Sequence, residues 1–531
     1  MFRWTIIVFL FLGFVSAAQS HGSTPDVVDV IHYRFEIELS DQSDAITGKA
    51  TITVKFLAPA SEIKFDLASL HEEKGMIAFQ VTEAGKELKT NQADDVLSIQ
   101  LLQSARTGEE RSFVVNYMGT PKDGLIISKN KYGDRTFFAD NWPNRAHNWI
   151  PCIDRPDDKA SFEFIVTAPS QYRVVSNGTL IEEKILDAQR KRTSWKEATA
   201  LSTKVMVIGA ARFAVKNYSD SPPAVPVSAW VYAQDSVRGF FDYAVAPAIV
   251  KFFSGYIAPF PYEKLANVQS KTIFGGMENA SAIFYAEESV TGDRKWEDVL
   301  AHEIAHQWFG DMASEKSFAH LWLSEGFATY LTDIYLQNKY GKDTAVKRLQ
   351  KEREDIVLFA QTNNHPVVDS TPDLMSLLNA NSYQKGSWIL HMLQWKVGDS
   401  LFQKIIQGYY QQYKGSNADT RDFEAVAERV SGRDLHDFFN FWLYQPQIPQ
   451  IKLSYSNKGD HPVIMVEQTG KSVLDFWLPL GYKTAQGNIQ EFALHINQRS
   501  MSFNNEKGKG LELLLDPLTQ LLFSGAISKI K

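Results

Sequence analysis

The sequence predicts a multidomain α+β protein in which a mainly helical domain lies between two β-rich domains. The chain has 531 residues, of which 44% are hydrophobic, and this length is too great for a single hydrophobic core. The hydrophobic pattern also changes twice, from period two to helical spacing and back again. We therefore expect a signal peptide at 1–18, an antiparallel β domain at 24–215, a mainly helical domain at 216–445 and a small β-sandwich at 446–531.

Alternation of apolar and polar residues indicates the first β domain. The stretches 32–39, 50–56 and 161–166 alternate with period two, and turn residues such as Ser176-Asn177-Gly178 separate the runs. This pattern is typical of antiparallel sheets with one face on the core and the other in water. The same alternation returns at 450–455 and 463–467, after Pro446 and Pro449 have ended the helical region, and it predicts the C-terminal sandwich.

Helical spacing dominates the middle of the chain. Apolar residues recur there at intervals of three and four, which places them on one face of a helix. The segments with this spacing are 237–253, 296–312, 321–339, 344–357, 384–397, 400–413, 420–430 and 435–443. We expect each of them to form a helix with its apolar face packed against its neighbours.

The N-terminus and the charge bear on location and partners. Arg3, an apolar run at 6–15 and the small residues at 16–18 are typical of a signal peptide, so we expect an exported protein, periplasmic or extracellular. The apolar run is short for a bilayer span, and we expect no stable membrane span after cleavage; an uncleaved anchor is the alternative. The formal net charge of −7 gives no basic footprint for nucleic acid.

Cys152 is the only cysteine of the chain. An exported protein with one cysteine has no internal disulfide, so its stability has to come from core packing. Cys152 lies among apolar residues, and we expect a buried, unreactive thiol rather than a nucleophile.

The sequence His302-Glu303-Ile304-Ala305-His306 predicts a metal site. On a helix, residues i and i+4 share a face, so the two imidazoles can converge on one cation. Zinc favours nitrogen ligands of this kind, in a tetrahedral set with one open position. Glu303 follows the first imidazole and is a candidate general base acting on a water.

Glu325 is the candidate third ligand, with eighteen residues between it and His306. That interval suits a short connection and a second helix that presents its carboxylate to the metal, and two His with one Glu form a known catalytic zinc set. The alternative is a solvated helix with ordinary surface contacts, but apolar flanking residues such as Trp308 and Trp322 favour burial. Asp311 either orients a ligand or caps the helix end.

These motifs resemble the M1 (gluzincin) family of zinc aminopeptidases, and the resemblance extends over most of the chain. The motifs that match are HEIAHQWFGD at 302–311, WLSEGFA at 322–328, GGMEN at 275–279, NSYQKG at 381–386, PCIDRP at 151–156 and SNGT at 176–179. The resemblance implies one Zn²⁺ per chain, held by His302, His306 and Glu325, and hydrolysis of the N-terminal bond of peptides that have a free N-terminus.

The resemblance also implies roles for the other motif residues. Glu303 and Tyr383 would be catalytic, the first as general base and the second as a donor to the oxyanion. Glu278 would bind the substrate α-amino group by charge-assisted hydrogen bonds. Gly275, Gly276 and Met277 would form the substrate-binding strand, where the two glycines allow close backbone approach. A second group near the amine is usual in the family, and Asp140 and Asn141 are the candidates here.

For the fold, the resemblance implies an N-terminal β saddle, a thermolysin-like catalytic domain and a small β-sandwich. Many members add a C-terminal helical domain that closes over the cleft. This chain is expected to be a short form without that domain, in which dimerisation or a more open cleft would compensate.

Three other functions remain open. An epoxide hydrolase of the leukotriene A4 hydrolase kind shares the GGMEN strand, but it has a further tyrosine where this chain has Leu378. A non-catalytic peptide-binding protein would keep the fold without the chemistry. An endopeptidase is compatible with the zinc motif alone, and Glu278 is the residue that argues against it.

Overall fold

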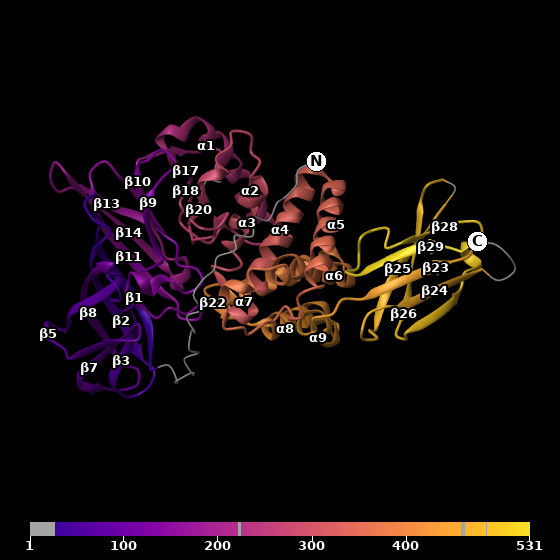
Figure 1. Cartoon of the computed structure of the whole chain (residues 1–531), viewed down its shortest axis with the longest axis horizontal. Coiled ribbons are helices and arrows are strands. Elements are labelled where there is room, and N and C mark those ends of the chain that lie inside the picture. The colour runs from indigo at the N-terminus through magenta and orange to yellow at the C-terminus, as the bar shows by residue number, and fades with distance from the viewer. Residues whose placement is uncertain (1–26, 221–224, 458–461, 485, 531) are drawn as a thin grey trace.

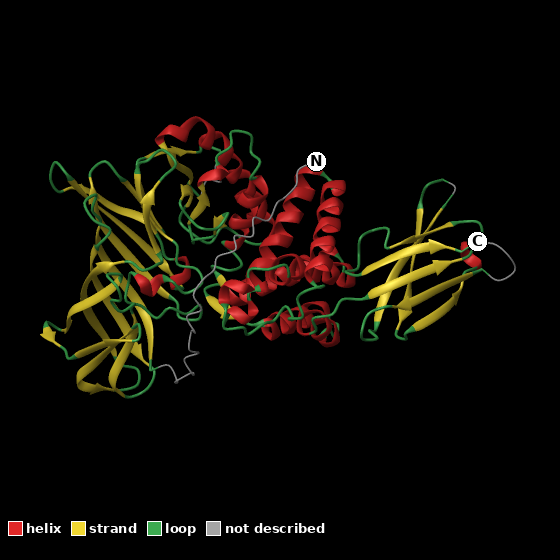
Figure 2. Cartoon of the chain, viewed as in Figure 1, coloured by secondary structure: helices red, strands yellow, loops and turns green. Residues whose placement is uncertain are grey.

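The computed structural model describes residues 27–220, 225–457, 462–484 and 486–530. The molecule is elongated, with a β-rich region at each end and the helices between them (Figures 1 and 2). The predicted α+β architecture is therefore confirmed. The expected signal peptide at 1–18 lies outside the described residues. In the described part of the chain, no helix has the length and apolar character needed to cross a membrane.

The N-terminal β domain is built on an eight-stranded sheet with the order β13-β14-β11-β1-β2-β8-β4-β5. Its strands are β1 (Val28–Glu38), β2 (Ile46–Phe56), β4 (Gly75–Glu83), β5 (Lys86–Glu87), β8 (Glu110–Thr120), β11 (Ala160–Pro169), β13 (Thr179–Ile185) and β14 (Arg190–Leu201). All neighbours pair antiparallel, as the alternation predicts, except β1 and β11, which run parallel. Strand β11 follows a long excursion of the chain, which a parallel pair requires.

Two smaller sheets complete this domain. They have the orders β3-β7-β6 and β12-β15-β10-β9. Their strands are β3 (Ala60–Asp66), β6 (Thr90–Ala93), β7 (Val96–Ala105), β9 (Leu125–Lys129), β10 (Arg135–Ala139), β12 (Arg173–Ser176) and β15 (Ile208–Ala211). Cys152 is fully buried between the sheets, as expected, and burial raises the pKa of its thiol well above the usual value.

The central domain begins with a five-stranded mixed sheet, in the order β16-β17-β18-β20-β19. The strands are β16 (Phe213–Asn217), β17 (Val227–Tyr232), β18 (Leu265–Ser270), β19 (Gly276–Met277) and β20 (Ala282–Ala286). Periodicity did not predict this sheet, because every residue of β18 is buried and a strand covered on both faces shows no alternation. The short strand β19 lies at the sheet edge, paired antiparallel with β20.

Nine α-helices follow or accompany this sheet in the described part of the chain. They are α1 (Ser236–Asp242), α2 (Ala246–Tyr256), α3 (Glu297–His306), α4 (Trp322–Tyr340), α5 (Lys342–Phe359), α6 (Gly386–Val397), α7 (Asp399–Tyr413), α8 (Thr420–Ser431) and α9 (His436–Tyr444), with a small sheet of β21 (Ala313–Glu315) and β22 (Ser416–Ala418). The helix expected at 237–253 is divided in two, and Pro247 stands in the first turn of the second piece. The helix expected at 296–312 ends at His306, before Gly310 turns the chain with φ 121°.

The C-terminal domain is a sandwich of two sheets, as predicted, with the orders β27-β24-β23-β29 and β26-β25-β28. Its strands are β23 (Gln450–Tyr455), β24 (Val463–Gln468), β25 (Phe476–Lys483), β26 (Ile489–Ile496), β27 (Ser500–Asn504), β28 (Glu512–Leu515) and β29 (Ser524–Lys529). It is joined to the helices by an ion pair of Arg353 with Asp516 (2.5 Å) and by His391, whose Nε2 lies 2.7 Å from the carbonyl oxygen of Thr519.

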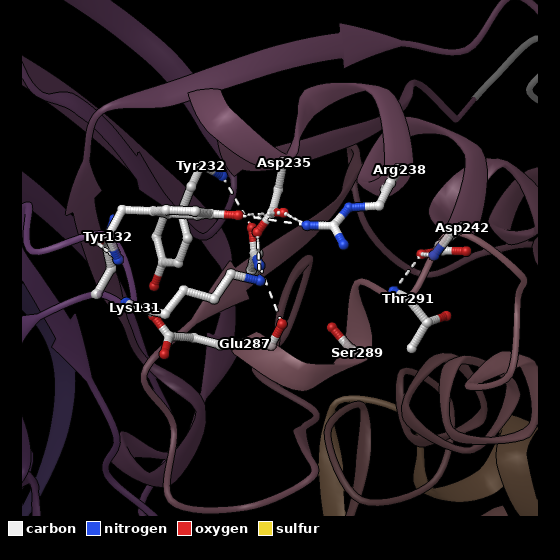
Figure 3. Close-up of polar contacts among 12 residues, drawn as sticks. Lys131, Tyr132, Tyr232, Asp235, Arg238, Asp242, Glu287, Ser289 and Thr291 are labelled. Carbon is white, nitrogen blue, oxygen red and sulfur yellow. Dashed lines mark hydrogen bonds and ion pairs between the residues drawn. The ribbon is translucent and has the colours of Figure 1, made fainter.

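Polar contacts fix the N-terminal domain to the central one, and one such cluster is centred on Asp235 (Figure 3). Lys131 and Tyr132 come from the turn between β9 and β10, and both reach the Asp235 carboxylate, at 2.6 and 2.7 Å. Arg238 of α1 pairs with the same carboxylate at 2.6 Å. Because Asp235 is buried, these bonds keep the two domains in one arrangement.

Candidate metal centre and substrate cavity

The structure brings His302, His306 and Glu325 together at one point. The two histidines lie one turn apart on α3, and Glu325 is in the first turn of α4. The two Nε2 atoms are 3.0 Å apart, and they lie 3.2 and 3.3 Å from Glu325 Oε2. A tetrahedral zinc ion with ligands at about 2.0–2.1 Å has ligand atoms about 3.3 Å from each other, so the three donors fit such an ion.

Further contacts orient the ligands. His306 Nδ1 lies 3.1 Å from the carbonyl oxygen of Phe309 and 3.0 Å from Ser324 Oγ. A proton on Nδ1 that is donated to the carbonyl leaves Nε2 free to bind a metal. Ser324 precedes Glu325 on α4, so the two ligand-bearing helices are also tied to each other at this histidine.

The charge balance of the centre favours a cation. Glu278, Glu303 and Glu325 are all buried around the imidazole pair. Burial by itself lowers the pKa of His306, but the carboxylates of Glu325 and Glu278 outweigh it and raise that pKa to about 10. Burial raises the pKa of Glu303 well above its usual range. Carboxylates that are buried in excess are stabilised by a bound metal ion or by a cationic ligand.

Glu303 and Glu278 lie next to the ligands. The ligand atoms of Glu278, Glu303 and His306 are all within 4.8 Å of one another, so both carboxylates face the same small volume. Strand β19 passes directly over Glu303, because a Cβ added at Gly276 would lie 2.3 Å from Glu303 Oε1. A glycine is therefore required at this position. Gly275 is under no such constraint, since a Cβ there would make only an ordinary contact with Trp296 at 3.5 Å.

Tyr383 enters the centre from a single turn of π-helix, η8 (Asn381–Lys385), that leads into α6. Such turns are frequent at functional sites. The Tyr383 ring is stacked on the imidazole of His302, with the centroids 5.9 Å apart. Gly326 and Gly386 make this possible, because a Cβ on Gly326 would lie 2.8 Å from the Gly386 Cα and would force the two helices apart.

A cavity of about 1030 Å³ opens onto the metal ligands. The residues of the substrate strand that were predicted from the sequence, Gly275, Gly276, Met277 and Glu278, line it together with Glu303 and Tyr383. Oε1 of Glu278 is buried and has no hydrogen-bond partner among the described residues. An unpaired buried carboxylate oxygen at a cavity wall is suited to accept a hydrogen bond from a ligand.

The two candidates for a second amine-binding group are engaged elsewhere. The Asn141 side chain donates to the carbonyl oxygens of Thr203 and Met206 and accepts a bond from Trp149. Asp140 Oδ2 accepts a bond from the backbone N–H of Ile273, so Asp140 holds the loop that precedes β19.

Asp311 and Leu378, which the motifs also drew attention to, have different surroundings. Asp311 Oδ2 accepts a hydrogen bond from the Gln307 side chain at 2.9 Å, and the Asp311 backbone N–H donates to the carbonyl oxygen of His306 at the end of α3. Leu378 lines the cavity.

Sequence reasoning did not identify two features next to the centre. Lys204 and Glu315 form a completely buried ion pair, and the charge of Lys204 acts on Glu278. Gln307 donates to the carbonyl oxygen of Glu278 and accepts from the N–H of Ser281, and so braces the substrate strand. The sequence does contain a sign of the buried ion pair, because Lys204 is the only charged residue in the otherwise small or apolar stretch 202–211.

Comparisons with known proteins agree with this geometry. The Peptidase family M1 domain matches residues 241–442, and the Peptidase M1 N-terminal domain matches residues 30–205. Aminopeptidase M1-A of Oryza sativa subsp. japonica is 27% identical over 449 residues, which cover 79% of this chain and 51% of that protein. Glutamyl aminopeptidase of Homo sapiens is 26% identical over 471 residues, 81% of this chain and 48% of that protein.

Probable aminopeptidase 2 of Sulfurisphaera tokodaii is 27% identical over 479 residues, 86% of this chain and 57% of that protein. The chain thus spans about half the length of the curated relatives it matches. Among solved structures, a variant of a two domain M1 zinc metallopeptidase bound to L-tryptophan matches 80% of this chain and 96% of its own, with a TM-score of 0.69 and 21% identity. With two models of one family matching most of its length, the chain belongs to peptidase family M1.

Proposed function

We propose that this protein is a zinc-dependent aminopeptidase, which hydrolyses the N-terminal bond of peptides. The observation that carries the proposal is the joint placement of a zinc-type ligand triad and the Glu278 carboxylate in one cavity. His302, His306 and Glu325 would hold the ion, at ligand separations of 3.0 to 3.3 Å. Relatives in Oryza sativa, Sulfurisphaera tokodaii and Homo sapiens that are named as aminopeptidases or a probable aminopeptidase support the same activity.

Bound zinc would supply Lewis-acid chemistry, polarising the scissile carbonyl and lowering the pKa of a water. The remaining steps belong to side chains of this protein. Glu303 lies within 4.8 Å of His306 and faces the cavity, where its carboxylate takes the proton of the attacking water and passes it to the leaving amine. Tyr383 is beside His302, and burial raises the pKa of its phenol, so the phenol stays protonated and can donate to the oxyanion.

Glu278 makes the proposed enzyme an exopeptidase. Its unpaired Oε1 is positioned to accept a charge-assisted hydrogen bond from the substrate α-ammonium group. Because Glu278 and His306 ligand atoms are within 4.8 Å, an ammonium bound there leaves room for only one residue before the bond that is cut. An endopeptidase would need this position free for a continuing chain.

The mechanism is tested by replacing Glu303 with glutamine. The expected result is a loss of at least about 10³ in kcat on an aminoacyl-peptide, because proton transfer is lost while the metal ligands remain. Zinc content, measured by mass spectrometry of the purified protein, should stay at one per chain. Glu288→Gln is the matched control, since Glu288 is exposed and does not line the cavity. Full activity of Glu303→Gln would refute the mechanism.

Substrate panels separate the other functions. We expect cleavage of peptides with a free N-terminus, no cleavage of the same peptides after N-acetylation, and loss of activity with a zinc chelator. Equal cleavage of blocked peptides would indicate an endopeptidase. Hydrolysis of a lipid epoxide in preference to peptides would indicate the epoxide hydrolase, and peptide binding without turnover in the zinc-loaded protein would indicate a binding protein.

We also propose that the protein is exported. The proposal is supported by the sequence at 1–18, with its basic start, apolar run and small residues. N-terminal sequencing of the protein from culture fractions tests it. A protein that keeps Met1 and stays inside the cell would exclude cleavage and export.

A further inference from the structure

The substrate strand ends at the residue proposed to bind the amine. The ladder between β19 and β20 pairs only Gly276 and Met277, so Glu278 lies just beyond it. The chain then turns back at once, because the N–H of Ala282 donates to the carbonyl oxygen of Asn279 at 3.0 Å. The Glu278 carboxylate is therefore carried by a short backbone segment between the end of a two-residue strand and a tight turn.

Ser281 gives this turn a backbone conformation that has to be held by its surroundings. Its φ is 61°, in the left-handed region that few residues other than glycine adopt. Its Oγ accepts a hydrogen bond from the N–H of Gly178 at 2.8 Å, and Lys264 donates to its carbonyl oxygen at 3.0 Å. A residue in such a conformation persists where several contacts fix it.

The Gln307 side chain supplies hydrogen bonds at both ends of this segment. Its Nε2 donates to the carbonyl oxygen of Glu278 at 2.7 Å, and its Oε1 accepts from the N–H of Ser281 at 2.7 Å. The same nitrogen donates to Asp311 Oδ2 at 2.9 Å. A backbone N–H can only donate, so the amide oxygen faces Ser281 and the amide nitrogen faces Glu278. The amide therefore fits in one orientation only.

Gln307 also directly follows a proposed metal ligand. His306 is the last residue of α3, and Gln307 is the C-cap of that helix. Gln307 is completely buried, so its amide depends on these protein partners. The ligand atoms of Glu278 and His306 lie within 4.8 Å of each other. One side chain thus connects the helix end that carries a metal ligand to the strand end that carries the amine-binding carboxylate.

We propose that Gln307 is a positioning residue, which sets the distance of the Glu278 carboxylate from the metal ligands and so the strength with which the substrate α-ammonium group is bound. The inference rests on the proposed aminopeptidase function and adds a residue to its substrate recognition. A charge-assisted hydrogen bond depends on distance and direction, so a strand that can shift by about 1 Å would hold the ammonium group less tightly.

Two ligands isolate the recognition of the amine. Leucine hydroxamate and isocaproic hydroxamate have the same metal-binding group and the same carbon chain, but the second lacks the amine. Calorimetry with the zinc-loaded protein gives both dissociation constants, and their ratio reports on amine binding. Wild type is expected to bind the ligand with the amine about 10- to 100-fold more tightly. Equal binding by wild type would overturn the proposed role of Glu278 and this inference with it.

Gln307→Met keeps the size of the side chain and removes its hydrogen bonds. The ratio should fall at least about threefold, while zinc content and the affinity for the ligand without the amine stay near the wild-type values. Gln307→Asn, which is too short to reach both Glu278 and Ser281, should also lower the ratio and serves if the methionine variant does not fold. An unchanged ratio in the folded variants would overturn the inference and leave the aminopeptidase function standing.

Gln269→Met is the matched control. Gln269 is also completely buried, and its amide bonds to Tyr232, Asp235 and Glu287, none of which lines the cavity. This variant should lose thermal stability, as Gln307→Met does, but keep the wild-type ratio of the two dissociation constants. The same fall of the ratio in both variants would show a general structural effect and refute the positioning role.

A double-mutant cycle with Glu278→Gln identifies the route by which Gln307 acts. Glu278→Gln should itself lower the ratio, because the charge that pairs with the ammonium group is lost. Adding Gln307→Met should then change the ratio by less than about twofold, since the carboxylate that Gln307 positions is no longer present. A further fall as large as that in the single variant would show that Gln307 acts independently of Glu278, contrary to the proposal.

Discussion

The two terminal β domains flank the same helices, but they are attached in different ways. The N-terminal domain reaches the substrate strand on both sides: Asp140 bonds to the N–H of Ile273 before it, and Asn177 bonds to the carbonyl oxygen of Ala280 after it. The C-terminal sandwich is joined through Arg353 and His391, neither of which lines the cavity.

The comparison shows that two β domains can flank the same helices although only one of them contributes residues to the substrate cavity. The N-terminal domain is part of the substrate cavity, since it supplies a wall residue, Trp142, and the buried Lys204. The C-terminal domain is a separate body attached at the far end of the helical layer (Figure 1). Substitutions at the first contact should therefore change both stability and activity, and those at the second should change stability alone.

The largest effect is expected for Lys204→Met. It leaves the Glu315 carboxylate buried without its partner, which should lower the free energy of unfolding by about 3–5 kcal/mol. It should also weaken substrate binding, because Lys204 acts on Glu278. Denaturant titration and kcat/KM measure the two effects. Lys196→Met, which opens an exposed pair with Glu163, is the control and should cost less than about 1 kcal/mol. Equal losses in the two variants would contradict the difference between buried and exposed pairs.

The second largest effect is expected in the pH dependence of stability, and it arises from Glu197 of β14, which lies near Glu263 of the central domain. Burial and the nearby Glu263 raise the pKa of Glu197 to about 7 from 4.5. The folded state therefore binds the carboxyl proton of Glu197 more tightly than the unfolded state does. The stability contributed by this proton is complete below pH 4.5 and is lost as the pH rises through about 7.

Glu197→Gln has no such proton to lose. Its stability relative to wild type should rise between pH 5 and pH 8, by up to about 3 kcal/mol, because one pKa unit corresponds to about 1.4 kcal/mol. Thermal unfolding at several pH values measures this. Glu183→Gln, on the exposed strand β13, should show no such trend. A constant difference between Glu197→Gln and wild type across this range would show that Glu197 does not titrate near neutrality.

The smallest effect is expected at the C-terminal contact. Asp516→Asn keeps the shape of the side chain, and asparagine tolerates the left-handed conformation there, with φ 44°. The loss of charge opposite the one-fifth-exposed Arg353 should cost about 2 kcal/mol in the stability of the sandwich, with kcat/KM unchanged. Limited proteolysis near residue 446 reports on the stability of the sandwich, and hydrolysis of a peptide with a free N-terminus reports on kcat/KM. A marked fall in kcat/KM would show that this domain does act on the site.

Local patterns predicted the fold and the core of the site. The i, i+4 spacing of His302 and His306 needs only helix geometry, and the strands of the large sheet need only period two. Glu325 was a candidate by its interval, and Glu278 and Tyr383 by their motifs. Strand β18 was missed because it is buried on both faces, and the helical spacing at 237–253 did not show that Pro247 divides the helix.

The remaining features depend on contacts between distant segments. Lys204 and Glu315 are 111 residues apart, and Asp298, Asp333 and Arg348, which are paired with one another, come from three helices. No short-range pattern encodes such pairings. The contacts of Asn141 could not be predicted from the sequence either, because its partners Thr203 and Met206 lie more than sixty positions further along the chain.

The contact between Gly326 and Gly386 has a consequence for how this site can vary. Gly326 adjoins the carboxylate that completes the ligand triad, and Gly386 closes the turn that carries the phenol. The two backbones touch, so any displacement of one helix moves the coordinating oxygen and the proton-donating hydroxyl relative to each other. Metal affinity and oxyanion stabilisation are thereby set by a single interhelical spacing, and a substitution that adjusts one of these properties would adjust the other as well.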